Sequence, residues 1–210
     1  GETVEAIAGE KAGILKQGIP CVMGPLTDGA AEVVRARARK LEVPLDKYGV
    51  DFEMTFEEKG SGTSEKVQPR CWAYGSADGF SVKGSLETFA RHQMDNAALA
   101  IACVRRLNEF DDLELENFVQ QGLANVSLPG RVEVISRDPW VIVDSAHTAA
   151  SAMALTRALE DFPPGPRHFV ISISSDKDPD AILSALLPAA AHVTLTRADP
   201  RRSIDLQKLA

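Results

Sequence analysis

Asp144 and His147 stand three positions apart, directly after the apolar run Trp140–Val143, and their side chains are well suited to chemistry. An unbroken apolar run is typical of a strand that is covered on both faces of a sheet. The polar turn after it leads to Thr148, whose hydroxyl can cap a helix predicted to run to Phe162. A carboxylate and an imidazole are therefore expected at the carboxyl end of a strand, where open α/β sheets bind ligands. The alternative is structural: an aspartate that ends a strand and a turn that caps a helix.

Arg131 follows Pro129-Gly130, a pair that breaks the chain between two regular regions. We expect a domain boundary at this break, within a few residues. A guanidinium at such a junction can hold a phosphate through two parallel hydrogen bonds. Arg131 is therefore a candidate phosphate-binding residue.

His92 and Asn96 are four residues apart in a helix predicted from about Phe89 to Leu107, so they share one face of it. The alanines that follow, beginning with Ala97, are small enough for another backbone or a planar ligand to approach closely. The alternative interpretation is a tightly packed core helix with a polar start.

Lys11 lies at the end of a helix predicted over Glu2–Ala12, within a run that continues to Lys16. Lysines are common at helix C-termini because the helix dipole favours a cation there. The functional alternative is a reactive amine held in a cleft.

The elements that position these residues follow from apolar spacing and turn signals. Ahead of the Pro-Gly break we expect a strand at Ile19–Met23, a helix at Ala30–Leu41 with a solvated basic face, a meander of short strands within Val43–Lys83 with a tip at Gly60–Glu65, and a helix at Leu115–Leu123. After the break we expect strands at Val132–Ser136, Trp140–Val143, His168–Ser172 and His192–Thr196, and helices at Ala149–Phe162, Ala181–Leu187 and from Ile204 onward. Alternation of this kind predicts βαβ units on a parallel sheet, and hence an α/β fold.

Composition excludes several classes of protein. The formal charge is −7, with 30 acidic and 23 basic residues, so no electrostatic footprint for nucleic acid or an anionic membrane is present. No apolar run approaches the roughly 20 residues that span a bilayer. Three cysteines without a C-x-x-C pair suggest neither a disulfide framework nor a zinc site. We expect a reducing compartment, either the cytoplasm or an organelle matrix, and no secretion.

Five motifs, taken in order, resemble those of the Mur ligase superfamily, most closely folylpolyglutamate synthase and dihydrofolate synthase. They are Gly1–Lys16 with its Glu10-Lys11-Ala12-Gly13-Ile14 core, His92–Ala100, Pro129-Gly130-Arg131, Asp144-Ser145-Ala146-His147-Thr148, and Asp176-Lys177-Asp178. The resemblance implies that residues 1–128 are the C-terminal half of the central ATPase domain. Residues 129–210 would be the Rossmann-like C-terminal domain, with a mainly parallel sheet that is incomplete at its end.

The family resemblance also implies an activity, namely an ATP-dependent amide ligase. Such an enzyme activates a folate or dihydropteroate carboxylate as an acyl phosphate and couples it to the amine of L-glutamate, with ATP and magnesium as cofactors. Lys11 would correspond to a lysine that is carbamylated and helps position magnesium. Asn96 would face the adenine, with His92 nearby.

The resemblance assigns the remaining roles to the second domain. Arg131 would contact an ATP phosphate, Asp144 the ribose, and His147 would lie on the glutamate side of the cleft. Thr148 and Ser172 depart from the asparagine and glycine that the family usually has at these positions.

No segment resembles the family's P-loop, whose backbone N–H groups cradle phosphate. We therefore expect a fragment or truncated relative that does not ligate glutamate by itself, with apolar sheet surface that self-association or a protein partner would cover. The alternatives are a non-catalytic binding or interaction protein on the same scaffold and, less favoured, another Mur-type ligase acting on cell-wall precursors.

Overall fold

The computed structural model describes residues 3–56, 70–86, 91–107, 110–199, 201, 202 and 204. The chain forms two compact units, and the main division between them falls between Val126 and Ser127. The tip expected at Gly60–Glu65 lies outside the described residues, as does the helix expected after Ile204.

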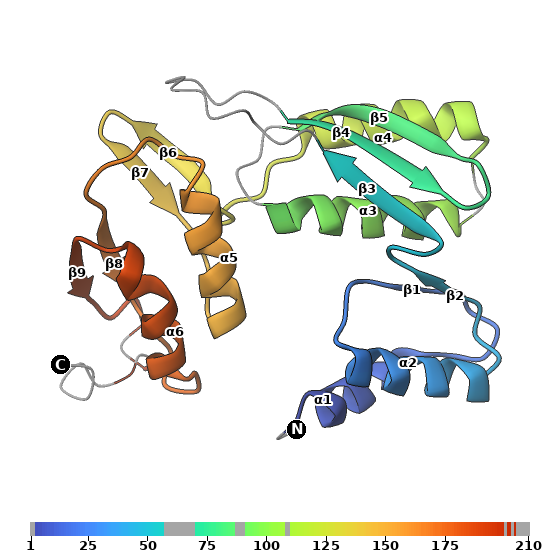
Figure 1. Ribbon diagram of the computed structural model, residues 1–210, viewed down its shortest axis with the longest axis horizontal. Coiled ribbons are helices and arrows are strands. Elements are labelled where there is room, and N and C mark those ends of the chain that lie inside the picture. The colour runs from blue at the N-terminus through green and yellow to red at the C-terminus, as the bar shows by residue number, and fades with distance from the viewer. Residues whose placement is uncertain are drawn as a thin grey trace. The chain divides into compact units, whose positions relative to one another are not determined.

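The elements that precede this division combine a parallel strand pair with an antiparallel meander (Figure 1). In chain order they are α1 (Val4–Lys11), the 3₁₀ turn η1 (Ala12–Ile14), β1 (Cys21–Met23), α2 (Asp28–Lys40), β2 (Leu45–Lys47), β3 (Phe52–Phe56), β4 (Arg70–Ser76), β5 (Ser81–Leu86), α3 (Arg91–Arg105) and α4 (Asp112–Asn125). β1 pairs with β2 in parallel, which the sequence pattern did not predict. β3, β4 and β5 pair antiparallel, and this confirms the meander.

The main core of this unit lies between the β3–β5 meander and the helices α3 and α4. Period-two alternation in β3 buries Phe52 and Met54 and leaves Glu53 and Thr55 exposed. Ala98 on α3 is fully buried, so its small side chain allows the helix to approach the sheet closely. The packed-core interpretation therefore holds for Ala97, Ala98 and Ala102, whereas Ala100 is exposed.

Local capping decides where several helices begin. Thr3 accepts the Ala6 N–H at 3.1 Å and caps α1. Asp111 and Glu114 form a reciprocal capping box, so α4 starts three residues earlier than the apolar spacing predicted.

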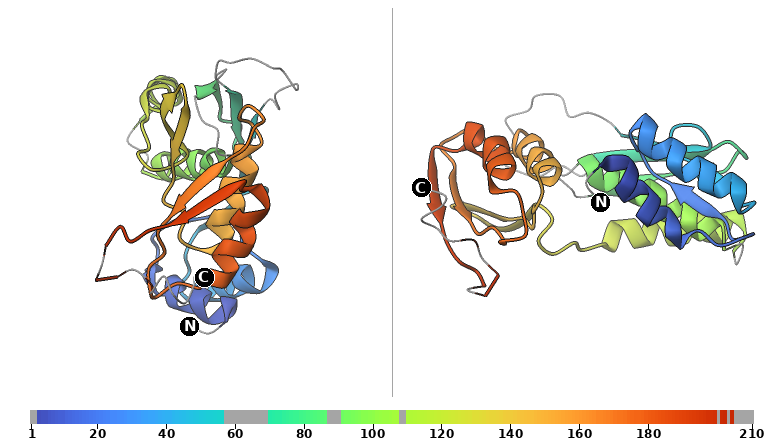
Figure 2. Two further views of the ribbon diagram at one scale, coloured as in Figure 1. Left: turned by 90° about the vertical axis from the view of Figure 1, so that its left-hand side faces the viewer. Right: turned by 90° about the horizontal axis from the view of Figure 1, so that it is seen from below.

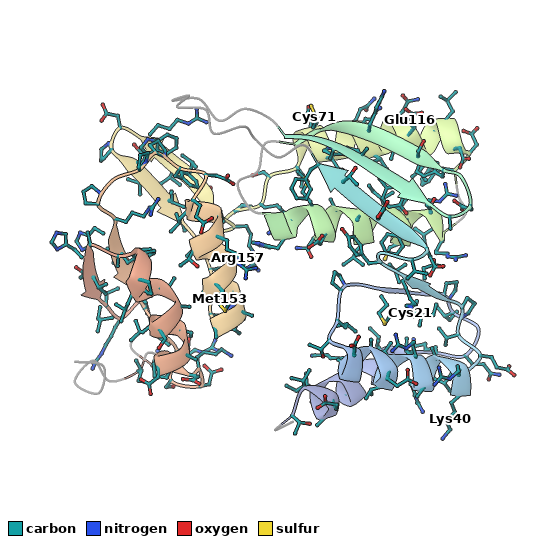
Figure 3. All side chains as sticks on the ribbon, viewed as in Figure 1. Cys21, Lys40, Cys71, Glu116, Met153 and Arg157 are labelled. Carbon is teal, nitrogen blue, oxygen red and sulfur yellow. The ribbon has the colours of Figure 1, made fainter. Side chains whose placement is uncertain are left out.

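A smaller core lies between β1 and α2, where Cys21 points from the strand toward the helix (Figure 3). The basic face of α2 is solvated, because Arg35 and Arg39 both pair with the exposed carboxylate of Glu32. This observation favours the solvated interpretation over a phosphate site.

The second unit alternates strands and helices, as predicted. Its elements are β6 (Glu133–Arg137), β7 (Trp140–Val143), α5 (Ala149–Leu159), β8 (His168–Ile171), α6 (Pro179–Leu186), the 3₁₀ turn η2 (Leu187–Ala189) and β9 (His192–Leu195). β6 and β7 pair antiparallel, while β8 and β9 pair in parallel. The α/β class is confirmed, with parallel and antiparallel pairs in both units.

α5 and α6 lie side by side, and Figure 2 shows them on the same side of the strands of this unit. Trp140 and Ile142 of β7 pack against the α5 region. The next residues, Val141 and Val143, are 38% and 42% exposed. The prediction that Trp140–Val143 is covered on both faces is therefore wrong for the described part of the chain, because both helices pack on one face.

In the described residues no helix is long and apolar enough to cross a membrane.

Candidate functional site

The segment after the Pro-Gly break is hydrogen-bonded to the turn after β7. The Ser145 N–H donates to the Gly130 carbonyl at 2.9 Å. Asp144 connects the two segments a second time, because its Oδ2 accepts the Val132 N–H at 2.8 Å while its Oδ1 accepts the Ala146 N–H at 2.7 Å. Two motifs that are separate in the sequence thus form one structural junction.

Arg131 is held between two residues with left-handed backbone. Gly130 has φ +66°, and Val132 has φ +52° although it is β-branched and buried. A β-branched residue with positive φ is a strained outlier that persists only where its surroundings impose it. The Arg131 side chain is exposed, and it makes no hydrogen bond or ion pair with any described residue. Its guanidinium is therefore available to an anion.

The ring of His147 is oriented by the backbone of its own turn. Nδ1 lies 3.0 Å from the Ser145 carbonyl oxygen, which can only accept a hydrogen bond. In the neutral ring Nδ1 therefore carries the proton, and the lone pair is on Nε2. The side chain is exposed, so this lone pair can accept a proton or a hydrogen bond from a ligand.

Ser151 fixes the backbone that carries His147. Its hydroxyl oxygen accepts the N–H groups of His147 and Thr148 at 3.0 and 2.9 Å, while Thr148 caps the helix by accepting the Ser151 N–H. The predicted cap at Thr148 is confirmed. The role of Ser151 was not predicted, although a polar side chain three residues after a threonine cap is the available sequence signal.

A cavity of about 630 Å³ lies within the second unit between β7 and β8. Its lining includes Asp144 and Ala146 from the turn after β7 and Ser172 directly after β8. Residues at the carboxyl ends of two strands therefore face one cavity, as expected for the ligand edge of an α/β sheet.

The candidate adenine residues lie at the start of α3. Asn96 is exposed and donates through Nδ2 to Oε1 of Gln93 at 3.2 Å, which leaves its carbonyl oxygen available. His92 is partly buried one turn earlier. Because Gln93 is 92% buried, it anchors the Asn96 amide from the core side.

Lys11 is the last residue of α1, and its side chain is exposed. Within the described part of the chain its ammonium has neither a hydrogen bond nor an ion pair, so it is accessible for carbamylation. No group of three or more His, Cys, Asp or Glu that could hold a metal ion occurs among the described residues. Magnesium commonly binds through one or two carboxylates plus phosphate oxygens and water, so a single carbamate at Lys11 fits this ion.

Sequence reasoning missed the contribution of Val132 and Glu133. Glu133 accepts the Gly130 N–H at 2.7 Å and so fixes the turn from its other side. Valine disfavours positive φ, so no local signal predicted the conformation of Val132.

Comparison with known proteins adds a family assignment for the second unit. Residues 130–210 match the family described as the glutamate ligase domain of Mur ligases.

Relatives match over most or all of the chain. The dihydrofolate synthase/folylpolyglutamate synthase of Mycobacterium tuberculosis is 30% identical over 100% of this chain and 44% of its own length. The folylpolyglutamate synthase of Lacticaseibacillus casei is 31% identical over 93% of this chain and 44% of its own length. A probable bifunctional folylpolyglutamate synthase/dihydropteroate synthase of Halobacterium salinarum is 30% identical over 100% of this chain and 24% of its own length. The chain thus spans from 24% to 44% of the length of these relatives.

Solved structures of folylpolyglutamate synthases are also similar to this chain over its whole length. The Mycobacterium tuberculosis folylpolyglutamate synthase in complex with ADP has a TM-score of 0.83 and 28% identity, covering 100% of this chain and 46% of that one. A folylpolyglutamate synthase in complex with AMPPCP and folate has a TM-score of 0.81 and 28% identity, with 100% and 50% covered.

Proposed function

Since this chain is a partial relative of the folylpolyglutamate and dihydrofolate synthases and carries a Mur ligase C-terminal domain, we propose that it serves ATP-dependent amide formation between a folate or dihydropteroate carboxylate and L-glutamate. Residues 1–128 would belong to the central ATPase domain and residues 129–210 to the C-terminal domain. The whole-chain similarity to folylpolyglutamate synthases supports this assignment.

The proposed reaction has two steps. A carboxylate oxygen of the folate or pteroate substrate takes the γ-phosphoryl group of ATP and releases ADP. The glutamate ammonium loses one proton to become an amine, which attacks the acyl carbon. The nitrogen loses a second proton as the amide bond forms and inorganic phosphate leaves. Magnesium, when bound, neutralises charge on the phosphates. The protein contributes mainly by positioning the reactants and stabilising charge.

The junction at Asp144 is the single observation that carries the proposal. One carboxylate fixes both the backbone beside Arg131 and the turn that presents His147. Arg131 has an exposed guanidinium that can contact an ATP phosphate. Each oxygen of Asp144 accepts one backbone N–H and keeps a second lone pair, which a ribose hydroxyl can use.

His147 serves the glutamate side in this proposal. Its tautomer, set by the Ser145 carbonyl, leaves Nε2 free to take a proton from the incoming ammonium. The cavity that Asp144 and Ser172 line would be part of the ligand-binding edge.

The first unit would supply the adenine and magnesium contacts. The free carbonyl oxygen of Asn96 can accept from the adenine amino group, with His92 beside it. Carbamylation would convert the exposed Lys11 from a cation to an anion that helps hold magnesium. These three assignments follow from the matched motifs.

Calorimetric titration of the chain with Mg-ATP tests the proposal. We expect measurable binding in the wild type and about 10- to 100-fold weaker binding in Arg131→Met, the change that loss of a charge-assisted contact produces. Arg157→Met is the matched control, because Arg157 is an exposed arginine on α5 that takes no part in the hydrogen bonds of the junction (Figure 3). Its affinity should equal that of the wild type.

Two results would reject the nucleotide-binding role. One is the absence of Mg-ATP binding, which a scaffold reused for a non-catalytic interaction would give. The other is an equal loss of affinity in both arginine variants. A coupled assay for folate- and glutamate-dependent ATP turnover then separates ligase activity from nucleotide binding alone. Because no segment of this sequence resembles the P-loop, we expect no turnover by this chain alone.

A further inference from the structure

Two histidines face each other across the parallel pair β8–β9. His168 and His192 are direct register partners, and their ring centroids are 6.1 Å apart with an interplanar angle of 72°. Both side chains are exposed. They stand at the amino ends of their strands, whereas Ser172 and the candidate ligand edge follow the carboxyl end of β8. The pair therefore lies at the amino end of β8, where His168 also lines the 630 Å³ cavity, whereas Ser172 lines that cavity at the carboxyl end of the strand.

Alternation along β8 separates these rings from the core. Phe169 and Ile171 pack against the helices of the unit. His168 and Val170 lie on the opposite, exposed face, where water and ions have access to the ring edges.

Thr194 orients the ring of His168. The threonine lies two residues after His192 on the same face of β9, and its Oγ1 is 2.8 Å from Nε2 of His168. When Nε2–H donates to this oxygen, the lone pair of the imidazole is on Nδ1. Histidines that bind metals commonly donate their second ring N–H to such a partner, which fixes the tautomer and the ring orientation.

We propose that His168 and His192 bind one divalent transition-metal ion of the zinc, nickel or copper class. Neutral imidazoles suit these ions, whereas magnesium and calcium prefer oxygen ligands. Two imidazoles that share an ion through bonds of about 2.1 Å place their centroids roughly 5–6 Å apart, so a small rotation of the exposed rings suffices.

The site takes two ligands from the protein and completes its coordination with water. This follows because the described residues include no group of three or more His, Cys, Asp or Glu that could hold an ion. The neighbouring Arg167 is directed away from the two imidazoles, because its guanidinium donates to the Leu159 carbonyl at 2.9 Å. A bound ion would link β8 to β9 and stabilise the folded unit against unfolding.

Titration of the full chain, without a histidine tag, with Zn²⁺ tests this site. We expect one bound equivalent in the wild type and at least about tenfold weaker binding in His168→Gln and in His192→Gln. Thr194→Val should weaken binding by about tenfold or more while leaving both imidazoles in place. His147→Gln is the matched control, because it removes a histidine of the same unit whose Nδ1 is bonded within its own turn, and it should leave the affinity for Zn²⁺ unchanged.

Histidine ring resonances of the wild type provide a readout that does not depend on variant folding. Those of His168 and His192 should shift together on addition of Zn²⁺, and those of His147 should stay in place. Wild-type affinity in the His168→Gln/His192→Gln double variant, or shifts confined to other histidines, would overturn the proposal. None of these outcomes depends on nucleotide binding or ligase activity.

Discussion

The carboxylate of Asp144 accepts the backbone N–H of Val132 at 2.8 Å, across twelve positions of sequence. This bond holds a buried, β-branched residue at φ +52°. The neighbouring Arg131 takes its position from this constraint, and the same carboxylate also fixes the Ala146 N–H. The candidate phosphate-binding residue Arg131 and the glutamate-side candidate His147 are thus both positioned by the Asp144 side chain.

Asp144→Asn should destabilise the second unit by about 1.5–3 kcal/mol. The amide offers one acceptor oxygen where the carboxylate offers two, so one of the two backbone N–H groups loses a charge-assisted bond. Chemical denaturation measures the loss, and faster hydrogen exchange of the Val132 or Ala146 amide locates it. Asp180→Asn, an exposed aspartate on α6, should change stability by less than about 0.5 kcal/mol. Equal effects of the two variants would contradict this role for Asp144.

Ser151→Ala should cost about 0.5–1.5 kcal/mol. The change removes the acceptor for the N–H groups of His147 and Thr148, and the better helix propensity of alanine offsets part of the loss. Thermal unfolding checks this prediction. Ser184→Ala, at an exposed position within α6, is the control and should be neutral or slightly stabilising. An unchanged unfolding temperature in Ser151→Ala would mean that water fully replaces the hydroxyl as the acceptor.

Gly84→Ala should destabilise the first unit by about 1–3 kcal/mol. A Cβ at this position would lie 2.7 Å from Cζ2 of Trp72, a side chain that is 98% buried and cannot move aside without repacking. Gly75→Ala on the neighbouring strand β4 is the matched control, because a Cβ added there would meet no atom within 4 Å. Similar denaturation midpoints for the two variants would show that the close approach of Trp72 does not exclude a Cβ at position 84.

Asp78 makes the stability of the first unit depend on acid pH. The Ser76 hydroxyl donates to its carboxylate at 2.6 Å, and with the Arg105 guanidinium this lowers the Asp78 pKa from 3.8 to about 2. A lowered folded-state pKa stabilises the fold above the unfolded value, and this contribution is lost as pH falls from about 4 to about 2.

Ser76→Ala should raise the Asp78 pKa toward its ordinary value and flatten this part of the pH–stability curve. NMR titration of the carboxyl carbon measures the shift directly. Ser81→Ala, an exposed serine on β5, should leave the Asp78 pKa unchanged. An unaltered Asp78 pKa in Ser76→Ala would assign the effect to Arg105 instead.

Local sequence determined much of this protein. Periodicity and turn residues were enough to predict the α/β class, the β3–β5 meander and the helix cap at Thr148, because these features depend on neighbours within a few residues. The ordered motifs likewise indicated the Mur ligase family, and the match of residues 130–210 supports that interpretation.

Tertiary structure decided what depends on partners distant in sequence. The parallel pairing of β1 with β2, the exposure of Val141 and Val143, and the pairing of His168 with His192 follow from which elements pack together. The left-handed Val132 is the clearest case. Its intrinsic preference opposes that conformation, and the fold imposes it through burial and a hydrogen bond to a residue that the chain brings back only after β7.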